Sequence, residues 1–229
     1  MEKEITPERS LVISYLTLRR AIGFLGLGLP FVVSLGALIL FHTGIQGSIS
    51  SYYYTGMREV LVGILWSIGV FLLSYNGYET EDAIAGKLAC VFAVGITLFP
   101  TAPDNNPSAK AVAIGNVHLA FAALFFFTLI YFSYFLFTRT SDKPEKHPMT
   151  QQKRQRNTVY RVCGVIMAVC ILLIGIYHFL PDKAAFIFSA YDPIFWLETI
   201  AIMAFGISWL IKGETLLKDK VERGFKAEK

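Results

Sequence analysis

Long apolar stretches alternate along the chain with short polar connections. Six stretches of about 20 residues carry few charged side chains, and a helix of that length crosses the ~30 Å hydrocarbon core of a bilayer. The predicted spans are about 21–41, 58–76, 83–100, 111–137, 162–180 and 193–211. The pattern therefore predicts an all-α polytopic membrane protein, in which residues 21–212 form a single bundle of six transmembrane helices.

The two ends of the chain are more polar than the spans. Thr6 followed by Pro7 is typical of a helix start, and residues from there to Arg20 place apolar side chains at helical spacing between charged ones. We predict that residues 1–20 contain a short amphipathic helix lying along the membrane interface. Residues 213–229 are predicted to be a charged cytoplasmic tail.

Composition and charge narrow the class of protein. Hydrophobic residues make up 54% of the chain and charged residues 17%, with a mean hydropathy of +0.51, which excludes a soluble nucleotide-binding fold and a disordered chain. With the N-terminus inside, all but three of the 21 Lys and Arg residues lie on the inner side, the exceptions being Arg58, Lys110 and Lys183. The positive-inside rule then predicts cytoplasmic N- and C-termini in a cytoplasmic (inner) membrane. Contact with membrane lipid accounts for the basic segments, and no nucleic-acid partner is expected.

An ionisable residue inside a predicted span costs several kcal/mol unless it faces a cavity or a partner, and three such residues stand out. Glu59, His118 and Glu198 all lie near the outer ends of their helices, at similar depth. Each shares a helix face with small residues, which are typical of helix contacts. We predict an outer polar pocket lined by these three side chains, with Arg58 and Asp104 near its mouth.

The first outer loop supplies further polar groups, among them Ser48, Ser50 and Tyr53. These hydroxyls are expected to form the roof of the pocket. A histidine beside carboxylates can bind a cation or hold the head group of an amphiphile, and Arg58 could meet a phosphate or carboxylate of that head group.

Several strings resemble a known family. They are Ser48-Ile-Ser-Ser, Leu98-Phe-Pro-Thr with Asp104, and His118 before a Phe-rich run. This order resembles a bacterial and archaeal family of six-span membrane proteins, the domain of unknown function nine-nine-eight, over residues 20 to 135. The resemblance implies a six-helix bundle without an established activity, and a single outer site that includes Ser48, Ser50, Asp104 and His118.

A more distant likeness is to membrane hydrolases that hold zinc with Ser, Asp and several His in a helical bundle. This chain lacks their paired histidines near the C-terminal end.

Three functions follow as hypotheses. The first is an outward-facing polar pocket that binds a small amphiphile or a lipid head group. The second is a metal-assisted lipid hydrolase, with His118 and Glu198 as ligands of a divalent metal and with His118, Glu198, Glu59 and Asp104 as the catalytic candidates. The third is a structural or assembly subunit, in which the three buried ionisable residues hold helices in register. The pattern does not indicate the oligomeric state.

Overall fold

The computed structural model describes residues 7–75, 77, 79–139, 150–179 and 191–215, and for residues 7–14 the backbone alone. Most of the described residues are helical, and no described residue forms a strand. The predicted all-α fold is confirmed. Most of the predicted tail, residues 216–229, lies outside the described part of the chain.

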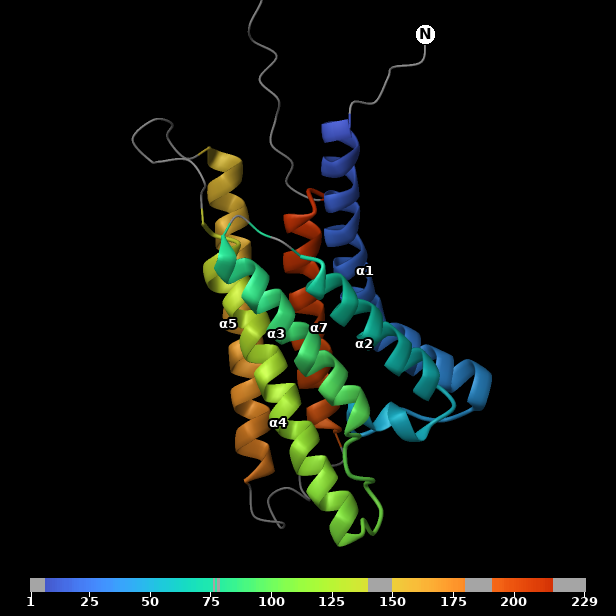
Figure 1. Cartoon of the computed structure of the whole chain (residues 1–229). Coiled ribbons are helices and arrows are strands. Elements are labelled where there is room, and N and C mark those ends of the chain that lie inside the picture. Colours follow the sequence, from blue (N-terminus) through green and yellow to red (C-terminus); the bar gives the residue numbers. More distant parts are fainter. Residues whose placement is uncertain (1–6, 76, 78, 140–149, 180–190, 216–229) are drawn as a thin grey trace, which may run out of the picture.

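The described part of the chain forms six long helices and two short helical segments (Figure 1). The long helices are α1 (Pro7–Phe41), α2 (Arg58–Leu73), α3 (Thr80–Leu98), α4 (Ala109–Tyr131), α5 (Gln151–His178) and α7 (Pro193–Lys212). A 3₁₀ helix, η1 (Ser50–Tyr54), precedes α2, and a π-helical turn, η2 (Phe132–Leu136), extends α4.

Four of these helices are long and apolar enough to cross a membrane. The four stretches are Tyr15–Phe41, Ala109–Leu136, Gln151–His178 and Pro193–Lys212. α2 has 16 residues and is therefore only about 24 Å long at 1.5 Å per residue. α3 carries Glu81, Asp82 and Lys87 in its first half. Both elements are helices as expected, while six crossings stay a prediction.

The first helix corrects one predicted boundary. We expected an interfacial helix to end near residue 20 and a separate span to follow, but α1 runs unbroken for 35 residues from Pro7 to Phe41. The sequence between Pro7 and Pro30 contains no further proline and no turn signal that would end the helix. α1 changes direction partway along (Figure 1), as expected of a helix with a proline inside it.

The helices lie side by side, and the connections that the structure describes lie at two ends of the bundle (Figure 1). α7 packs between α1 and α5, and α3 packs between α2 and α4. We call the end that holds connections 42–57 and 99–108 and the start of α7 the groove end. The opposite end, where α1 and α5 begin and α7 finishes, is called the basic end.

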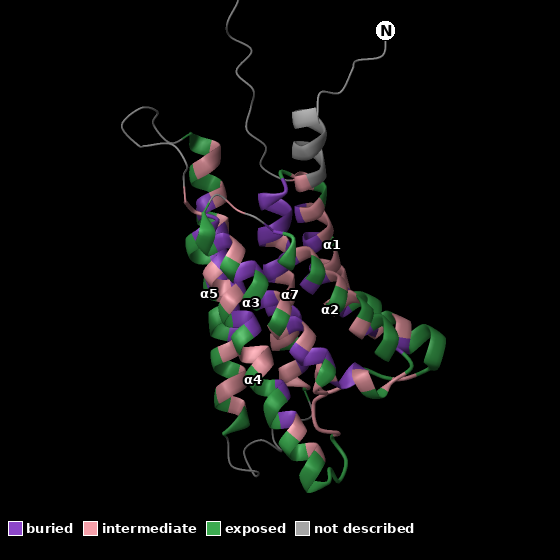
Figure 2. Ribbon diagram, viewed as in Figure 1, coloured by how far each residue is buried: buried purple, intermediate pink, exposed green. Residues whose placement is uncertain are grey.

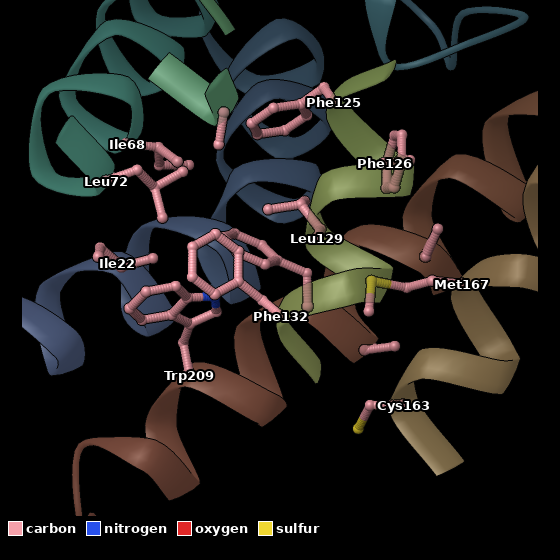
Figure 3. Close-up of a cluster of buried hydrophobic side chains, with 14 of the residues drawn as sticks. Ile22, Ile68, Leu72, Phe125, Phe126, Leu129, Phe132, Cys163, Met167 and Trp209 are labelled. Carbon is pink, nitrogen blue, oxygen red and sulfur yellow. The ribbon is translucent and has the colours of Figure 1, made fainter. Parts of the chain in front are cut away.

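An aromatic cluster fills the bundle towards the basic end. Trp209 is fully buried, and its ring centroid lies 5.0 Å from those of Tyr75 and Phe137 and 5.5 Å from that of Phe132 (Figure 3). The buried residues line the inside of the bundle, and the outward faces of the helices are exposed (Figure 2). These exposed faces are rich in large apolar side chains, as lipid contact requires.

Glycines let α1 and α7 approach until their backbones touch. A Cβ added at Gly206 would lie 2.5 Å from the backbone nitrogen of Leu27 and 2.9 Å from the carbonyl oxygen of Gly23. Both contacts are with backbone atoms, so they cannot be relieved by a side-chain rotation. This close approach fixes the position of α7, which carries Glu198.

Gly206→Ala is expected to destabilise the fold by about 1–3 kcal/mol, because the added methyl group forces α1 and α7 apart. Thermal unfolding in one detergent measures this. Gly28→Ala is the matched control, since a Cβ there meets nothing within 4 Å. Equal unfolding temperatures for the two variants would contradict the close packing.

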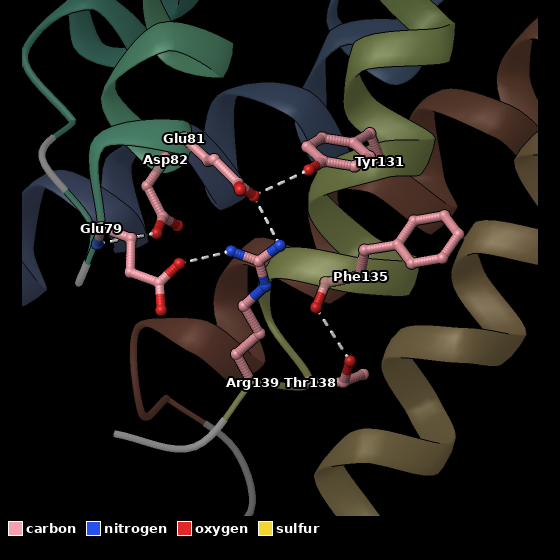
Figure 4. A network of polar contacts seen from close by, with 7 residues as sticks. All are labelled: Glu79, Glu81, Asp82, Tyr131, Phe135, Thr138 and Arg139. Atoms are coloured by element: carbon pink, nitrogen blue, oxygen red, sulfur yellow. Dashed lines mark hydrogen bonds and ion pairs between the residues drawn. The ribbon is translucent and has the colours of Figure 1, made fainter.

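A polar network at the basic end ties the start of α3 to the end of α4 (Figure 4). The Arg139 guanidinium bridges two carboxylates, Glu79 at 2.7 Å and Glu81, and the Tyr131 hydroxyl donates to Glu81 at 3.1 Å. The hydrogen bonds from Arg139 and Tyr131 lower the pKa of Glu81. Asp82 completes the turn, because its side chain accepts from the Glu79 N–H in a capping box.

The network gives a pH-dependent prediction. Because the pKa of Glu81 is lower in the folded state, its contribution to stability is present above the ordinary carboxyl pKa and is lost as the pH falls through the lowered value. Arg139→Gln should unfold at a lower temperature than the parent protein at neutral pH. We expect the difference to vanish in acid, where Glu81 is protonated in both proteins. A difference that persists unchanged at low pH would show that Arg139 acts by packing.

Candidate functional site

The loop before α2 is held against the start of α7. The Ile49 N–H donates to Oε2 of Glu198 at 2.6 Å, and the Phe195 N–H donates to the carbonyl oxygen of Gly47 at 3.0 Å. Tyr52 lies fully buried beside the Phe195 ring. These contacts place η1 across the groove end of the bundle.

His118 joins α4 to the end of α3 and to this loop. Its Nδ1 lies 2.8 Å from the carbonyl oxygen of Phe99 and 3.2 Å from that of Ile96, at the end of α3, where helix carbonyls lack partners within the helix. A carbonyl oxygen can only accept, so Nδ1 carries the proton. In the neutral ring Nε2 is then an acceptor, and the Ser50 hydroxyl, 3.0 Å away, donates to it.

A glycine allows this contact. A Cβ added at Gly115, one turn before His118, would lie 2.8 Å from the backbone nitrogen of Ala102. The connection after α3 therefore packs directly on the α4 backbone, which brings the Phe99 carbonyl within reach of the imidazole.

A small cavity of about 60 Å³ lies inside the bundle beside this contact. Its wall is mostly apolar, and its polar lining includes Ser50, Tyr53, Thr97, His118 and Glu198.

A larger groove of about 1440 Å³ runs between α4 and α5. Its walls are mainly apolar and include Leu119, Ala123 and Phe127 from α4 and Ala168 and Leu172 from α5. Its polar lining belongs mostly to the groove end and includes Ser48, Ser50, Ser51, Asp104, Asn116, His118, His178, Asp192 and Glu198. The groove is therefore apolar along most of its length and polar at one end. Ser50, His118 and Glu198 line both the groove and the small cavity.

Most of the predicted site residues come together at this end. Ser48, Ser50, Asp104, His118 and Glu198 line the groove. His118 is 4% exposed, whereas Asp104 is an exposed residue. Tyr53 lines the small cavity.

Two predicted site residues lie elsewhere. Glu59 is exposed on α2, and neither cavity includes it in its lining. Leu61, two residues further on, faces the interior, and two residues in an α-helix are about 200° apart around the axis. The prediction that Glu59 lines the pocket is therefore wrong. Arg58 is also exposed, and it stacks over the Tyr53 ring and donates to the Tyr53 carbonyl oxygen at 2.8 Å, which fastens the loop.

The donor set does not fit the metal hypothesis. Among the described residues no group of three or more His, Cys, Asp or Glu side chains lies close enough to hold a metal ion. Both ring nitrogens of His118 have hydrogen-bond partners within the protein, and Glu198 binds the backbone of the loop.

Two parts of the groove were missed by sequence reasoning. Asp192 directly precedes α7, where its backbone is left-handed, with φ of 45°, and its side chain makes no capping hydrogen bond. Its carboxylate faces Gly47 together with that of Asp104. The α5 wall, including Ala168 and Gly175, gave no signal because small and apolar residues are equally typical of lipid-facing positions.

Comparison of the chain with protein-family models, with curated proteins and with solved structures gave no match. The resemblance to the six-span family stays a prediction.

Glu198→Ala should release the loop before α2. Leaving the buried N–H of Ile49 without a partner costs about 1–3 kcal/mol, and we expect hydrogen–deuterium exchange of the amides around Ile49 to accelerate. Glu59→Ala removes an exposed carboxylate and is the control. Unchanged exchange at Ile49 in Glu198→Ala would contradict the anchoring role.

Proposed function

We propose that the chain is an integral protein of the cytoplasmic (inner) membrane that binds an amphiphile in the groove between α4 and α5. In this proposal the six long helices cross the membrane, both termini are cytoplasmic and the groove end faces outward. The distribution of cations supports this orientation. Of the described lysines and arginines, only Arg58 and Lys110 lie in the half of the molecule nearer the groove end.

The shape and composition of the groove are the main support for this proposal. Exposed apolar side chains along its lining include Leu119 and Phe127 on α4 and Leu172 and Ile176 on α5. An acyl chain from the surrounding lipid can lie against these side chains without leaving an apolar environment. The polar end supplies hydrogen-bonding groups at the depth where a head group would lie. A groove of this size also exceeds the ~300–1,000 Å³ of common small-ligand pockets.

The charges at the groove end favour one class of head group. Asp104, Asp192 and Glu198 all belong to its lining, and the described lining includes no Lys or Arg. Arg58 and Lys110, the two described basic residues in this half of the molecule, do not belong to that lining and are not placed to meet a phosphate in the groove. A head group that carries a positive charge or several hydrogen-bond donors fits this end better than an anionic one.

A structural role is the second candidate, because of the hydrogen bonds that His118 and Glu198 make. Each satisfies backbone groups of another element, as residues that hold helices in register would do. This role does not require a ligand.

Gly175→Phe tests the binding proposal. A Cβ at Gly175 meets nothing within 4 Å, and the residue lines the groove, so a phenylalanine ring there would occupy ligand space without straining the fold. In native mass spectra we expect the parent protein to retain tetradecyltrimethylammonium, a cationic amphiphile, in preference to myristate. Gly175→Phe should lose at least ten-fold in affinity for the cation.

Gly28→Phe provides the matched control. It is a partly exposed helical glycine, like Gly175, with open space at its Cβ, and neither cavity includes it. This variant should bind as the parent protein does. Equal binding by the parent and both variants would reject the groove as the site, and the absence of any binding would favour the structural role.

A further inference from the structure

Ser50 differs from the other serines of its loop. The hydroxyls of Ser48 and Ser51 lie 2.8 Å apart and hydrogen-bond to each other, and the Ser51 N–H donates to Ser48 Oγ at 2.9 Å. The Ser50 hydroxyl instead contacts Nε2 of His118 at 3.0 Å. It is therefore the serine whose proton is directed at a base.

The histidine is in the form that such a base requires. Because Nδ1 donates to the carbonyl oxygens of Phe99 and Ile96, the lone pair of the neutral ring is on Nε2 and points at Ser50. A nucleophile, a base and a third group that orients the base are the parts of an activated serine. Here the carbonyl end of α3 is the orienting group.

We propose that Ser50 and His118 are a nucleophile and its general base, which transfer the acyl group of an ester-linked amphiphile bound in the groove. The inference rests on the proposed function, since the groove must bring the ester to Ser50. Both residues line the groove at its polar end, where the head group and the first carbons of the chain would meet. An ester between a cationic alcohol and a fatty acid places its carbonyl at that junction.

The reaction balances with water as the second reactant. Oγ of Ser50 bonds to the ester carbonyl carbon while its proton passes to Nε2 of His118. The carbon–oxygen bond to the alcohol then breaks, and the alcohol leaves with the proton from Nε2. Water, deprotonated by the same nitrogen, attacks the acyl-serine, which releases the fatty acid and returns the proton to Ser50.

The acyl transfer is expected to be slow, because Glu198 occupies backbone N–H groups that could otherwise stabilise an oxyanion. The N–H groups of Ile49 and Ser50 interact with its carboxylate, and that of Ser51 donates to Ser48. These backbone donors are therefore not directed at a developing oxyanion, and one missing donor costs about 10²–10³ in rate. Covalent labelling is consequently a better readout than multiple turnover.

The test uses the full chain in a detergent without ester bonds. A fluorophosphonate probe should label the parent protein at Ser50, located by peptide mass spectrometry, and myristoylcholine should yield myristate in the same preparation. Ser50→Ala should abolish both signals. Ser67→Ala, which removes an exposed hydroxyl that bonds only within α2, should label as the parent does.

His118→Gln separates the base from its structural role. The glutamine amide can donate to the Phe99 carbonyl and accept from Ser50, but it cannot take a proton at neutral pH. We expect an unchanged unfolding temperature and labelling slowed by about 100-fold or more.

The outcomes distinguish this inference from the proposed function. Binding of the cationic amphiphile without labelling or hydrolysis would overturn the acyl transfer and leave the binding proposal intact. Labelling that is equally fast in His118→Gln would overturn the role of His118 as the base. Failure of the parent protein to bind the amphiphile would overturn the proposed function, and the choice of substrate with it.

Discussion

The hydrogen bonds of one imidazole connect three separate parts of the chain at the groove end. His118 belongs to α4, its Nδ1–H satisfies carbonyls at the end of α3, and its Nε2 accepts from the loop that leads into α2. Glu198 holds the same loop from the side of α7. Without these two side chains the loop would lose its hydrogen bonds to side chains of α4 and α7, and the groove would lose part of its polar surface.

The same arrangement shows how binding and stability are linked in this fold. A buried histidine and a partly buried glutamate in apolar helices are costly residues, and each is compensated by backbone groups that would otherwise lack partners. The compensation leaves one hydroxyl, that of Ser50, at the surface of the groove in contact with a base. The hydrogen bond between Ser50 and His118 stabilises the loop and is also the contact that the proposed acyl transfer requires. Substitutions that preserve the hydrogen bonds are therefore needed to separate the two roles.

The sequence predicted the helices and part of the site for identifiable reasons. The apolar runs of α1, α4, α5 and α7 are long, so their assignment depends little on side-chain detail. His118 and Glu198 were found because an ionisable group in such a run must face a partner. Glu59 was misplaced because the small residues Gly63 and Ser67 on its face suit both helix contact and exposure, whereas the buried Leu61 marks the inner face. The α5 wall and Asp192 depend on long-range packing and on a left-handed backbone, neither of which a local pattern encodes.

The π-helical turn at the end of α4 determines from which side the interior can be reached. The Phe137 N–H donates to the Phe132 carbonyl oxygen, five residues back, so the wider turn directs four neighbouring side chains inward: Phe132, Ser133, Leu136 and Phe137. Together with Trp209 they occupy the interior at the basic end, while the groove opens at the other. In the proposed orientation, an amphiphile that enters from the outer leaflet of the bilayer must return to that leaflet. Occupancy would then follow the composition of one leaflet alone, because the described residues close the interior at the basic end and offer no route there for moving lipid across the membrane.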